Sequence, residues 1–327
     1  MKVFLTGATG AIGRALLPRL QEAGHAVTAL VRSAGKQREV EAAGATGVIA
    51  DPLDADALGR VVGRAAPDAI VHELTALSGP MDFRKADEAF ALTNRFRTET
   101  TGMLFAAARA HGVRRVLVQS FCGWPFARLG GPVKTEQDPL DPDPPRGIRR
   151  TIEALREQEK MVRSSADLEA KALRYGALYG PGTDLAQDGW IVAGLQRRRL
   201  PLVGNGAGIW SFLHVDDAAT ATVAALERGA PGIYNIVDDE PAPVSAWLPA
   251  LAAAVGAPPP WRIPAWMARF AIGETGVVMM TDIRGGANTK AKLELGWRPR
   301  WDSWRRGFVE GLERGRGPDS NAAGALG

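Results

Sequence analysis

Thr6-Gly7-Ala8-Thr9-Gly10-Ala11-Ile12-Gly13 follows directly on an apolar run at residues 3–5 and opens a stretch with helical periodicity. Glycines at such a junction allow a tight turn, let the backbone come close to a pyrophosphate, and let the helix pack on the strand. The amino terminus of the helix adds free N–H groups and a favourable dipole for phosphate oxygens. This strand, turn and helix together predict a fold that binds a dinucleotide.

The residues that follow alternate between short apolar runs and helical stretches. The apolar runs fall at residues 26–31, 47–50, 69–72 and 116–119, and clear helical stretches fall at residues 11–23 and 98–111. This alternation is typical of a parallel sheet whose two faces are covered by crossover helices. We therefore predict an α/β protein with a Rossmann-type, doubly wound parallel sheet in residues 1–175.

The second half of the sequence is more irregular and predicts a smaller, carboxy-terminal substrate-binding lobe in residues 176–314. A segment near residues 214–228 has helical periodicity and is expected to return to the Rossmann domain. Residues 315–327 are mostly small or polar, so we expect a disordered tail there.

Composition narrows the classes of function. A single cysteine, Cys122, excludes a disulfide framework and a cysteine-based zinc cluster, and no metal site is predicted. The net charge of +4 comes from short basic clusters without a nucleic-acid-binding motif, so no nucleic-acid partner is expected. No apolar stretch is long enough for a signal peptide or a membrane span. These features predict a cytoplasmic protein whose partner is a small molecule and not a membrane.

The end of the second apolar run discriminates between the two nicotinamide dinucleotides. A carboxylate at that point binds the adenine ribose hydroxyls of NAD. Here Val31 is followed by Arg32 and Ser33. A guanidinium matches a 2′-phosphate with two hydrogen bonds, so the sequence favours NADP over NAD. The alternative is that Arg32 is an ordinary surface arginine.

Several further motifs resemble the extended short-chain dehydrogenase/reductase superfamily, which includes the sugar-nucleotide epimerases and dehydratases. They are Ala50-Asp51-Pro52-Leu53-Asp54, Val71-His72-Glu73-Leu74-Thr75, residues 173–182, residues 212–217 and Leu295-Gly296-Trp297-Arg298-Pro299. The resemblance implies that Asp51 contacts adenine. It also implies that residues 71–75 pass the cofactor and that residues 173–182 lie beside the nicotinamide. With the glycine turn, the predicted cofactor site comprises Gly7, Thr9, Gly10, Ala11, Ile12, Gly13, Arg32, Ser33, Asp51, Pro52, Leu53, Glu73, Leu74, Thr75, Tyr175, Ala177 and Leu178.

The catalytic centre departs from the pattern of that superfamily. Its members use a Tyr with a Lys four residues later, beside a Ser or Thr, for proton transfer. None of the three tyrosines here, Tyr175, Tyr179 and Tyr234, has a Lys four residues later. Aligning the helix by Glu159 places Thr151 at the Tyr position and Leu155 at the Lys position. The usual proton-transfer dyad is therefore absent.

Ser120 stands where the family's catalytic Ser or Thr is placed, so it either hydrogen-bonds a substrate oxygen or caps the end of a strand. Tyr179 is the preferred replacement proton donor, because its segment borders the nicotinamide in relatives. Ser120 and Tyr179 are thus the predicted catalytic residues. Weaker candidates for the proton donor are Arg150, Glu153 and His72.

The substrate is also expected to differ from a nucleotide sugar. Sugar-nucleotide members carry an Arg that holds the diphosphate just before residues 212–216, and here that position is Trp210. Because Trp offers a flat apolar face with one hydrogen-bond donor, a small aromatic or otherwise apolar molecule fits better. The predicted substrate-binding residues are Cys122, Trp124, Trp190 and Trp210, with Cys122 as a small packing residue rather than a nucleophile.

Together these features predict an NADP-dependent oxidoreductase, a reductase or dehydrogenase acting on a small, largely apolar or aromatic carbonyl or alcohol. Two alternatives stay open. One is a non-redox lyase, cyclase or isomerase on the same fold, and the other is a redox-silent NADP-binding sensor or scaffold. The resemblance also implies a homodimer, formed through the helices near residues 98–111 and 151–164.

Overall fold

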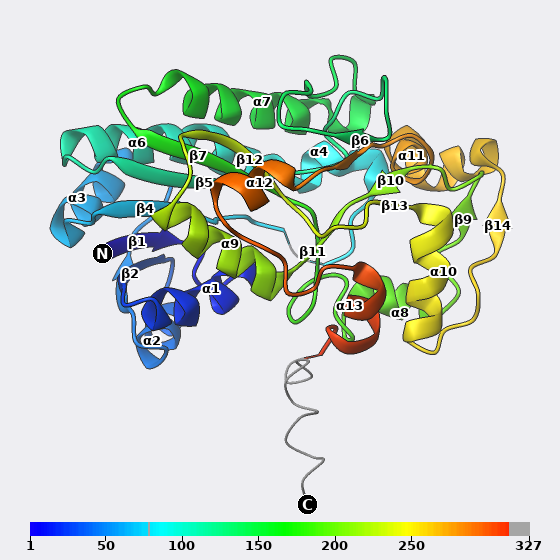
Figure 1. Ribbon diagram of the computed structural model, residues 1–327, viewed down its shortest axis with the longest axis horizontal. Helices are drawn as coiled ribbons and strands as arrows, with labels where there is room; N and C mark the ends of the chain where they lie inside the picture. Colours follow the sequence, from blue (N-terminus) through cyan, green and yellow to red (C-terminus); the bar gives the residue numbers. More distant parts are fainter. Residues whose placement is uncertain (78, 314–327) are drawn as a thin grey trace, which may run out of the picture.

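The computed structural model describes residues 1–77 and 79–313, and its centre is a seven-stranded sheet (Figure 1). Every pairing within this sheet is parallel, and the strand order is β12-β7-β5-β4-β1-β2-β3. The order reverses direction beside β1, which is the defining feature of a doubly wound sheet. The strands are β1 (Lys2–Thr6), β2 (Ala26–Val31), β3 (Thr46–Ile49), β4 (Ala69–His72), β5 (Arg115–Phe121), β7 (Glu169–Tyr175) and β12 (Gly232–Ile236).

Helices cover both faces of the sheet, because side chains alternate along each buried strand. On β5, Leu117 packs toward α1 and α9, whereas Val116 and Val118 pack toward α3, α6 and α7. Figure 1 shows α1 and α9 lying side by side on one face and α6 with α7 on the other. These helices are α1 (Ala11–Glu22), α2 (Ala34–Ala42), α3 (Ala55–Ala65), α6 (Thr101–Ala110), α7 (Arg149–Ser164) and α9 (Val215–Glu227). The predicted fold class is confirmed.

The smaller lobe has its own core, built mainly of aromatic side chains: Phe212, Trp247, Trp301, Trp304 and Phe308. Its helices are α8 (Trp190–Gln196), α10 (Val244–Ala254), α11 (Ala265–Thr281), α12 (Thr289–Glu294) and α13 (Trp304–Glu310). Three short strand pairs lie within it: β8 (Ala177–Tyr179) with β11 (Phe212–His214), β9 (Leu202–Val203) with β14 (Arg262–Ile263), and β10 (Ile209–Trp210) with β13 (Ala242–Pro243). A fourth pair, β6 (Val133–Lys134) with β15 (Gly285–Gly286), joins it to the first domain.

The return of the chain to the first domain is longer than the expected segment near residues 214–228. α9 packs on α1, and β12 then joins the edge of the main sheet beside β7. Ala291 and Leu295 also belong to the core under α1 and α9. The tail expected at residues 315–327 lies outside the described residues. Within residues 1–77 and 79–313, no helix is long and apolar enough to cross a membrane.

One helix begins earlier than its pattern predicts. The stretch expected from residue 98 continues upstream through a wide turn, η2 (Phe96–Thr100), into α5 (Ala91–Arg95). Its buried face carries Thr93, Phe96, Arg97, Thr100 and Thr101, spaced three and four residues apart. Four of these five residues are polar, so the face lacks the apolar periodicity that reveals a helix in sequence. The short elements that precede α5 or α7 are η1 (Phe83–Lys85), α4 (Ala86–Ala89) and η3 (Arg146–Ile148).

Candidate active site

The glycine turn is packed on its inner side and open on its outer side. Gly7 has φ of +83°, and a Cβ placed there would lie 2.5 Å from the carbonyl oxygen of Glu73. A Cβ on Gly13 would lie 2.1 Å from the carbonyl oxygen of Gly7. A Cβ on Gly10, in contrast, would meet only that same carbonyl, at 3.3 Å. Gly10 is exposed and caps α1, so the turn leaves room for a pyrophosphate at the amino terminus of the helix.

A cavity of about 400 Å³ lies beside the ends of β2 and β3. The structure brings four of the predicted cofactor residues together around it: Arg32, Asp51, Pro52 and Leu53. The Asp51 carboxylate accepts a hydrogen bond from the backbone N–H of Leu53 (2.9 Å), which holds this loop in a tight turn. The cavity has the size and apolar floor that an adenine ring requires.

Four residues that line this cavity were not predicted as cofactor residues. Ile49 and Ala50 come from the end of β3 and the loop after it. Leu92 and Phe96 line it from α5 and η2. Leu92 and Phe96 are four residues apart, which is the spacing of side chains on one face of a helix. This spacing was the sequence signal that could have placed them on a helix before residue 98. It went unused because the helix was expected to begin only at residue 98.

Arg32 lies at the rim of the cavity, with its side chain exposed. Within the described part of the chain, no carboxylate pairs with its guanidinium. Ser33 has a different role in the fold: its hydroxyl accepts from the backbone N–H of Lys36 (3.4 Å) and caps α2. Arg32 is therefore free to meet a phosphate, whereas Ser33 stabilises the helix that follows.

The glycine turn and the cavity at Asp51 together form the predicted dinucleotide groove, and the residues after β4 lie directly behind the turn, where the carbonyl of Glu73 faces Gly7. Glu73 is buried, and the Tyr175 hydroxyl donates to its carboxylate (2.8 Å) while also bonding the Thr222 hydroxyl (2.6 Å). Burial raises the pKa of Glu73 to about 8. These polar groups satisfy one another beneath the groove. The next two residues, Leu74 and Thr75, are partly exposed.

Two further predicted cofactor residues lie on β8: Ala177, which is buried, and Leu178, which is partly exposed. The loop after β8 reaches the start of α1, since a Cβ on Gly182 would lie 3.9 Å from Ala11 Cβ. Of the remaining predicted cofactor residues, Thr9 and Ala11 are partly exposed and Ile12 is buried. Their contacts with a dinucleotide stay predictions.

Ser120 is 1% exposed, and its hydroxyl donates to the Glu159 carboxylate (2.9 Å). The same carboxylate receives two hydrogen bonds of 2.6 Å each from the Arg174 guanidinium. Ser120 thus belongs to a buried network that joins β5, α7 and β7. This geometry favours a structural role for Ser120, the alternative that the sequence left open.

The structure does not bring Tyr179 to Ser120. The Tyr179 ring packs in the core of the smaller lobe, 5.1 Å from the His214 ring and 5.5 Å from the Phe308 ring. Its hydroxyl is buried beside Gly307 and has no hydrogen-bond partner among the described residues. Burial raises the pKa of Tyr179 well above its ordinary value. Its surroundings are those of a packed core residue.

The weaker proton-donor candidates are either already hydrogen-bonded or exposed to solvent. Both ring nitrogens of His72 are engaged, with the Thr6 hydroxyl (2.7 Å) and the carbonyl of Phe96 (3.2 Å). Burial lowers the pKa of His72 to about 4, so the ring is neutral. Arg150 and Glu153 are exposed on α7.

The position of the missing dyad is filled by neutral groups. The Thr151 hydroxyl donates to Asp87 (2.7 Å) and accepts from the side-chain amide of Asn94 (3.0 Å). Asp87 also accepts the backbone N–H groups of Arg150 (3.0 Å) and Thr151 (2.9 Å), so it caps α7. Leu155, at the Lys position, is fully buried. Neither α7 position therefore supplies an ionisable group.

An aromatic wall stands next to this position, at the end of β5. It consists of Phe90, Phe121 and Trp124, with the Trp124 ring 5.1 Å from Phe121 and 6.1 Å from Phe90. Phe121 and Trp124 are partly exposed. Trp124 also lines a narrow crevice that runs under Met279 of α11. Trp124 is the predicted substrate-binding residue in this wall, and its contact with a substrate stays a prediction.

The other three predicted substrate residues are not part of this wall, although Cys122 belongs to the apolar cluster on which the wall packs. Trp210 packs against Phe212 and Trp247, and its indole N–H donates to the carbonyl of Met279 (3.0 Å). Burial raises the pKa of the Cys122 thiol, which lies against Gly286. Trp190 begins α8 and is partly exposed. Among the four, Trp124 is the one in the aromatic wall.

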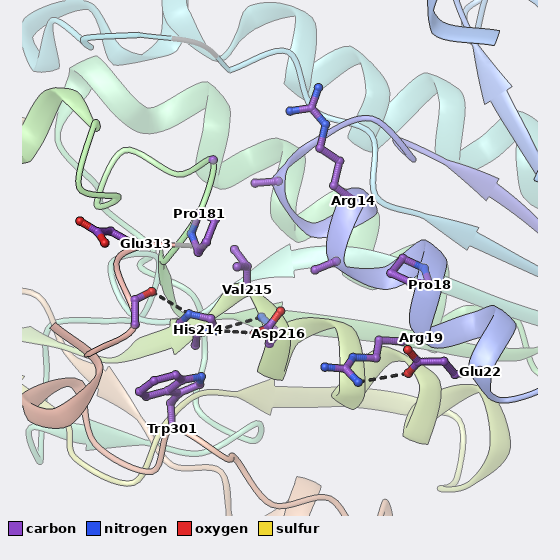
Figure 2. Close-up of a pocket in the computed structure, with 14 residues that line it drawn as sticks. Arg14, Pro18, Arg19, Glu22, Pro181, His214, Val215, Asp216, Trp301 and Glu313 are labelled. Carbon is purple, nitrogen blue, oxygen red and sulfur yellow. Dashed lines mark hydrogen bonds and ion pairs between the residues drawn. The ribbon is translucent and has the colours of Figure 1, made fainter. Parts of the chain in front are cut away.

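A second hollow, of about 410 Å³, opens between α1 and the start of α9 (Figure 2). The His214 ring caps α9 by accepting from the N–H of Asp216 (3.1 Å), and its other nitrogen meets the carbonyl of Gly311 (2.9 Å). The two arginines of its rim are paired, Arg14 with Glu39 (2.9 Å) and Arg19 with Glu22 (3.1 Å). Because its charged groups are satisfied, we assign no ligand to this hollow.

Comparisons with known proteins identify the family of this chain. A model of the "NAD dependent epimerase/dehydratase family" matches residues 3–237. The chain is 46% identical over 311 residues to a "3-diazoavenalumate denitrifying reductase" from a Streptomyces species, covering 94% of this chain and 99% of that protein. It is 31% identical over 274 residues to a "2-alkyl-3-oxoalkanoate reductase" from Stenotrophomonas maltophilia, covering 79% of this chain and 77% of that protein.

The same architecture occurs among solved structures. The fold matches a UDP-glucose 4-epimerase from Thermus thermophilus, solved in complex with NAD, with a TM-score of 0.73 over the full length of both chains. The sequence identity in that comparison is 22%, so the similarity concerns the fold. The homodimer expected through the helices now seen as α6 and α7 stays a prediction.

Proposed function

This chain belongs to the NAD dependent epimerase/dehydratase family, and we propose that it is an NADP-dependent reductase of a small, largely aromatic substrate. One observation carries the proposal. The glycine turn is open on the side of Gly10, an aromatic wall lies at the end of β5, and no ionisable side chain stands at the two α7 positions of the missing dyad. This combination suits hydride transfer to an acceptor that requires little help from a protein acid.

The residues of the groove fit NADPH. The open face of Gly10 and the amino terminus of α1 suit the pyrophosphate, the cavity at Asp51 and Phe96 suits adenine, and the free Arg32 suits a 2′-phosphate. When bound, NADPH supplies a hydride, and the protein's part is to orient the substrate against it and exclude water. Trp124 and Phe121 would hold the substrate ring by stacking.

We propose an aromatic diazo compound as the substrate class. The relative with 46% identity is named as a denitrifying reductase of a diazo compound. A hydride that adds to the terminal nitrogen of an arenediazonium group, Ar–N₂⁺, gives Ar–N=N–H. Loss of N₂ then leaves Ar–H, with the hydrogen on the ring carbon and the two hydride electrons in the new C–H bond. No alkoxide develops in this reaction, so the absence of the Tyr and Lys costs little.

A carbonyl compound is the second candidate, because another relative is a reductase of an oxoalkanoate. Reduction of a carbonyl places negative charge on oxygen, which must be stabilised and then protonated. The Asn94 side-chain amide is the neutral donor at that position, because the Thr151 hydroxyl donates its single proton to Asp87. Neutral donors stabilise an alkoxide less well than a Tyr next to a Lys, so we expect slower carbonyl reduction.

The test is to mix the purified protein with NADPH and a hydroxyl-substituted arenediazonium carboxylate, and in parallel with a panel of aromatic ketones and aldehydes. We expect NADPH consumption that matches both the N₂ released and the Ar–H formed. Turnover of the carbonyl panel alone would support the second candidate. Tight NADPH binding without turnover of either panel would contradict a reductase and support a non-redox role.

Replacing Arg32 with Ala is expected to weaken NADPH binding by about 10- to 100-fold, which corresponds to the loss of a charge-assisted hydrogen-bonded contact. NADH has no 2′-phosphate, so its affinity should change little. Calorimetric titration of both dinucleotides measures the difference. Equal losses for NADPH and NADH would show that Arg32 does not recognise the 2′-phosphate.

A further inference from the structure

Arg97 is a buried arginine without a buried counter-ion. Its side chain projects from η2 and is 6% exposed. One nitrogen of the guanidinium donates to the side-chain oxygen of Asn94 (3.0 Å), and the group lies over the Phe90 ring at 5.5 Å. Burial lowers the pKa of Arg97 to about 10, so the group is still charged at neutral pH.

No carboxylate in residues 1–77 or 79–313 forms an ion pair with Arg97. Asp87 is on the neighbouring α4, but its two oxygens accept the N–H groups that begin α7 and the Thr151 hydroxyl. The other buried arginine, Arg174, shows the usual arrangement, with Glu159 bound through two short hydrogen bonds. An isolated buried charge is costly, so Arg97 has a strong preference for an anionic partner.

The location of Arg97 indicates where that partner comes from. Asn94 connects the guanidinium to the Thr151 hydroxyl, which occupies the position of the missing Tyr. Phe90 connects it to Trp124, because the Phe90 ring contacts both the guanidinium and the Trp124 ring. Arg97 thus stands at the polar end of the aromatic wall, on the first-domain side of the substrate site.

We propose that Arg97 binds the carboxylate of an aromatic acid, with the ring of that acid against Phe90, Phe121 and Trp124. This inference rests on the proposed function, since it names the substrate class of the same site. A guanidinium binds a carboxylate through two parallel hydrogen bonds, so it fixes both the position and the orientation of the ring. The charge that the fold leaves without a counter-ion is then neutralised by the substrate.

The test compares cinnamate with its neutral analogue cinnamamide, each titrated calorimetrically into protein saturated with NADP⁺. We expect cinnamate to bind at least tenfold more tightly than cinnamamide to the wild type. Arg97→Met should abolish this preference, and Arg97→Lys should retain part of it. Arg95→Met is the matched control, because Arg95 lies on the same helical segment but is exposed and paired with Glu99 (2.7 Å).

A second measurement separates binding from folding. In thermal unfolding without ligand, Arg97→Met is expected to melt at or above the wild-type temperature, because the substitution removes a buried unpaired charge. Cinnamate should raise the melting temperature of the wild type and of Arg95→Met, but not of Arg97→Met. If Arg97→Met does not fold, the comparison of cinnamate and cinnamamide on Arg97→Lys and the wild type decides the question.

Three results would overturn this inference: no preference of the wild type for cinnamate, equal losses for cinnamate and cinnamamide in Arg97→Met, or a fall in NADP⁺ affinity in that variant. The last result would mean that Arg97 holds the cofactor instead. If the wild type binds no NADP⁺, the proposed function itself fails, and that result is visible before either probe is added.

Discussion

Gly10→Asp is expected to abolish dinucleotide binding and to leave the fold intact. A Cβ on Gly10 meets only the Gly7 carbonyl, at 3.3 Å, so the new side chain extends outward into the open groove and not into the core. There it places a carboxylate at the amino terminus of α1, on the site that the turn provides for a pyrophosphate. Repulsion and steric overlap together should reduce NADPH affinity by more than about 100-fold, a change of roughly 3 kcal/mol.

Two other glycines provide the controls for this experiment. Gly59→Asp adds the same charge on α3 at a position where a Cβ has no atom within 4 Å, so NADPH affinity should not change. Gly13→Ala places its Cβ 2.1 Å from a backbone oxygen, so it should lower thermal stability even without cofactor. Calorimetry and thermal unfolding of the three variants separate the site from the fold. NADPH affinity near the wild-type value in Gly10→Asp would show that the dinucleotide does not cross this turn.

The sequence predicted the first domain well, because its signals are local. The strands Ala26–Val31 and Ala69–His72 coincide with the predicted apolar runs, since a strand buried on both faces is a continuous apolar run. The glycine turn was equally clear. Each of its close contacts is made by backbone, so only glycine satisfies them and the pattern of the turn is visible in the sequence.

The substrate site was harder to predict, because its residues are brought together by tertiary packing. Arg97 was missed since it lies on a buried helix face made mostly of polar residues, where apolar periodicity gives no signal. Trp210 occupies the position of a diphosphate-binding Arg in relatives, but in this fold its ring completes the aromatic core around Trp247. The position of a residue in a motif therefore does not predict which surface its side chain contacts in the folded protein.

The same limit applies to Ser120, and a stability measurement can distinguish its two possible roles. Its position at the end of β5 suggested catalysis, but its hydroxyl donates into the Glu159–Arg174 pair. If Ser120 is structural, Ser120→Ala should lose about 1.5–3 kcal/mol of stability, the net value of a hydrogen bond to a charged group, and keep its turnover rate. A large loss of turnover at normal stability would instead support direct contact with the substrate.

Arg174→Met is expected to destabilise the fold far more, by about 3–5 kcal/mol in urea unfolding. Glu159 is 4% exposed and Arg174 1% exposed, so the substitution leaves a carboxylate buried without its cation. The double variant Glu159→Leu with Arg174→Met should recover most of that stability, because an apolar pair carries no desolvation cost. If the two single losses simply add in the double variant, the two side chains are not coupled. Strong coupling would identify this pair, with Ser120, as the support that fixes β5, α7 and β7 beneath the aromatic wall, and not as the proton-transfer machinery.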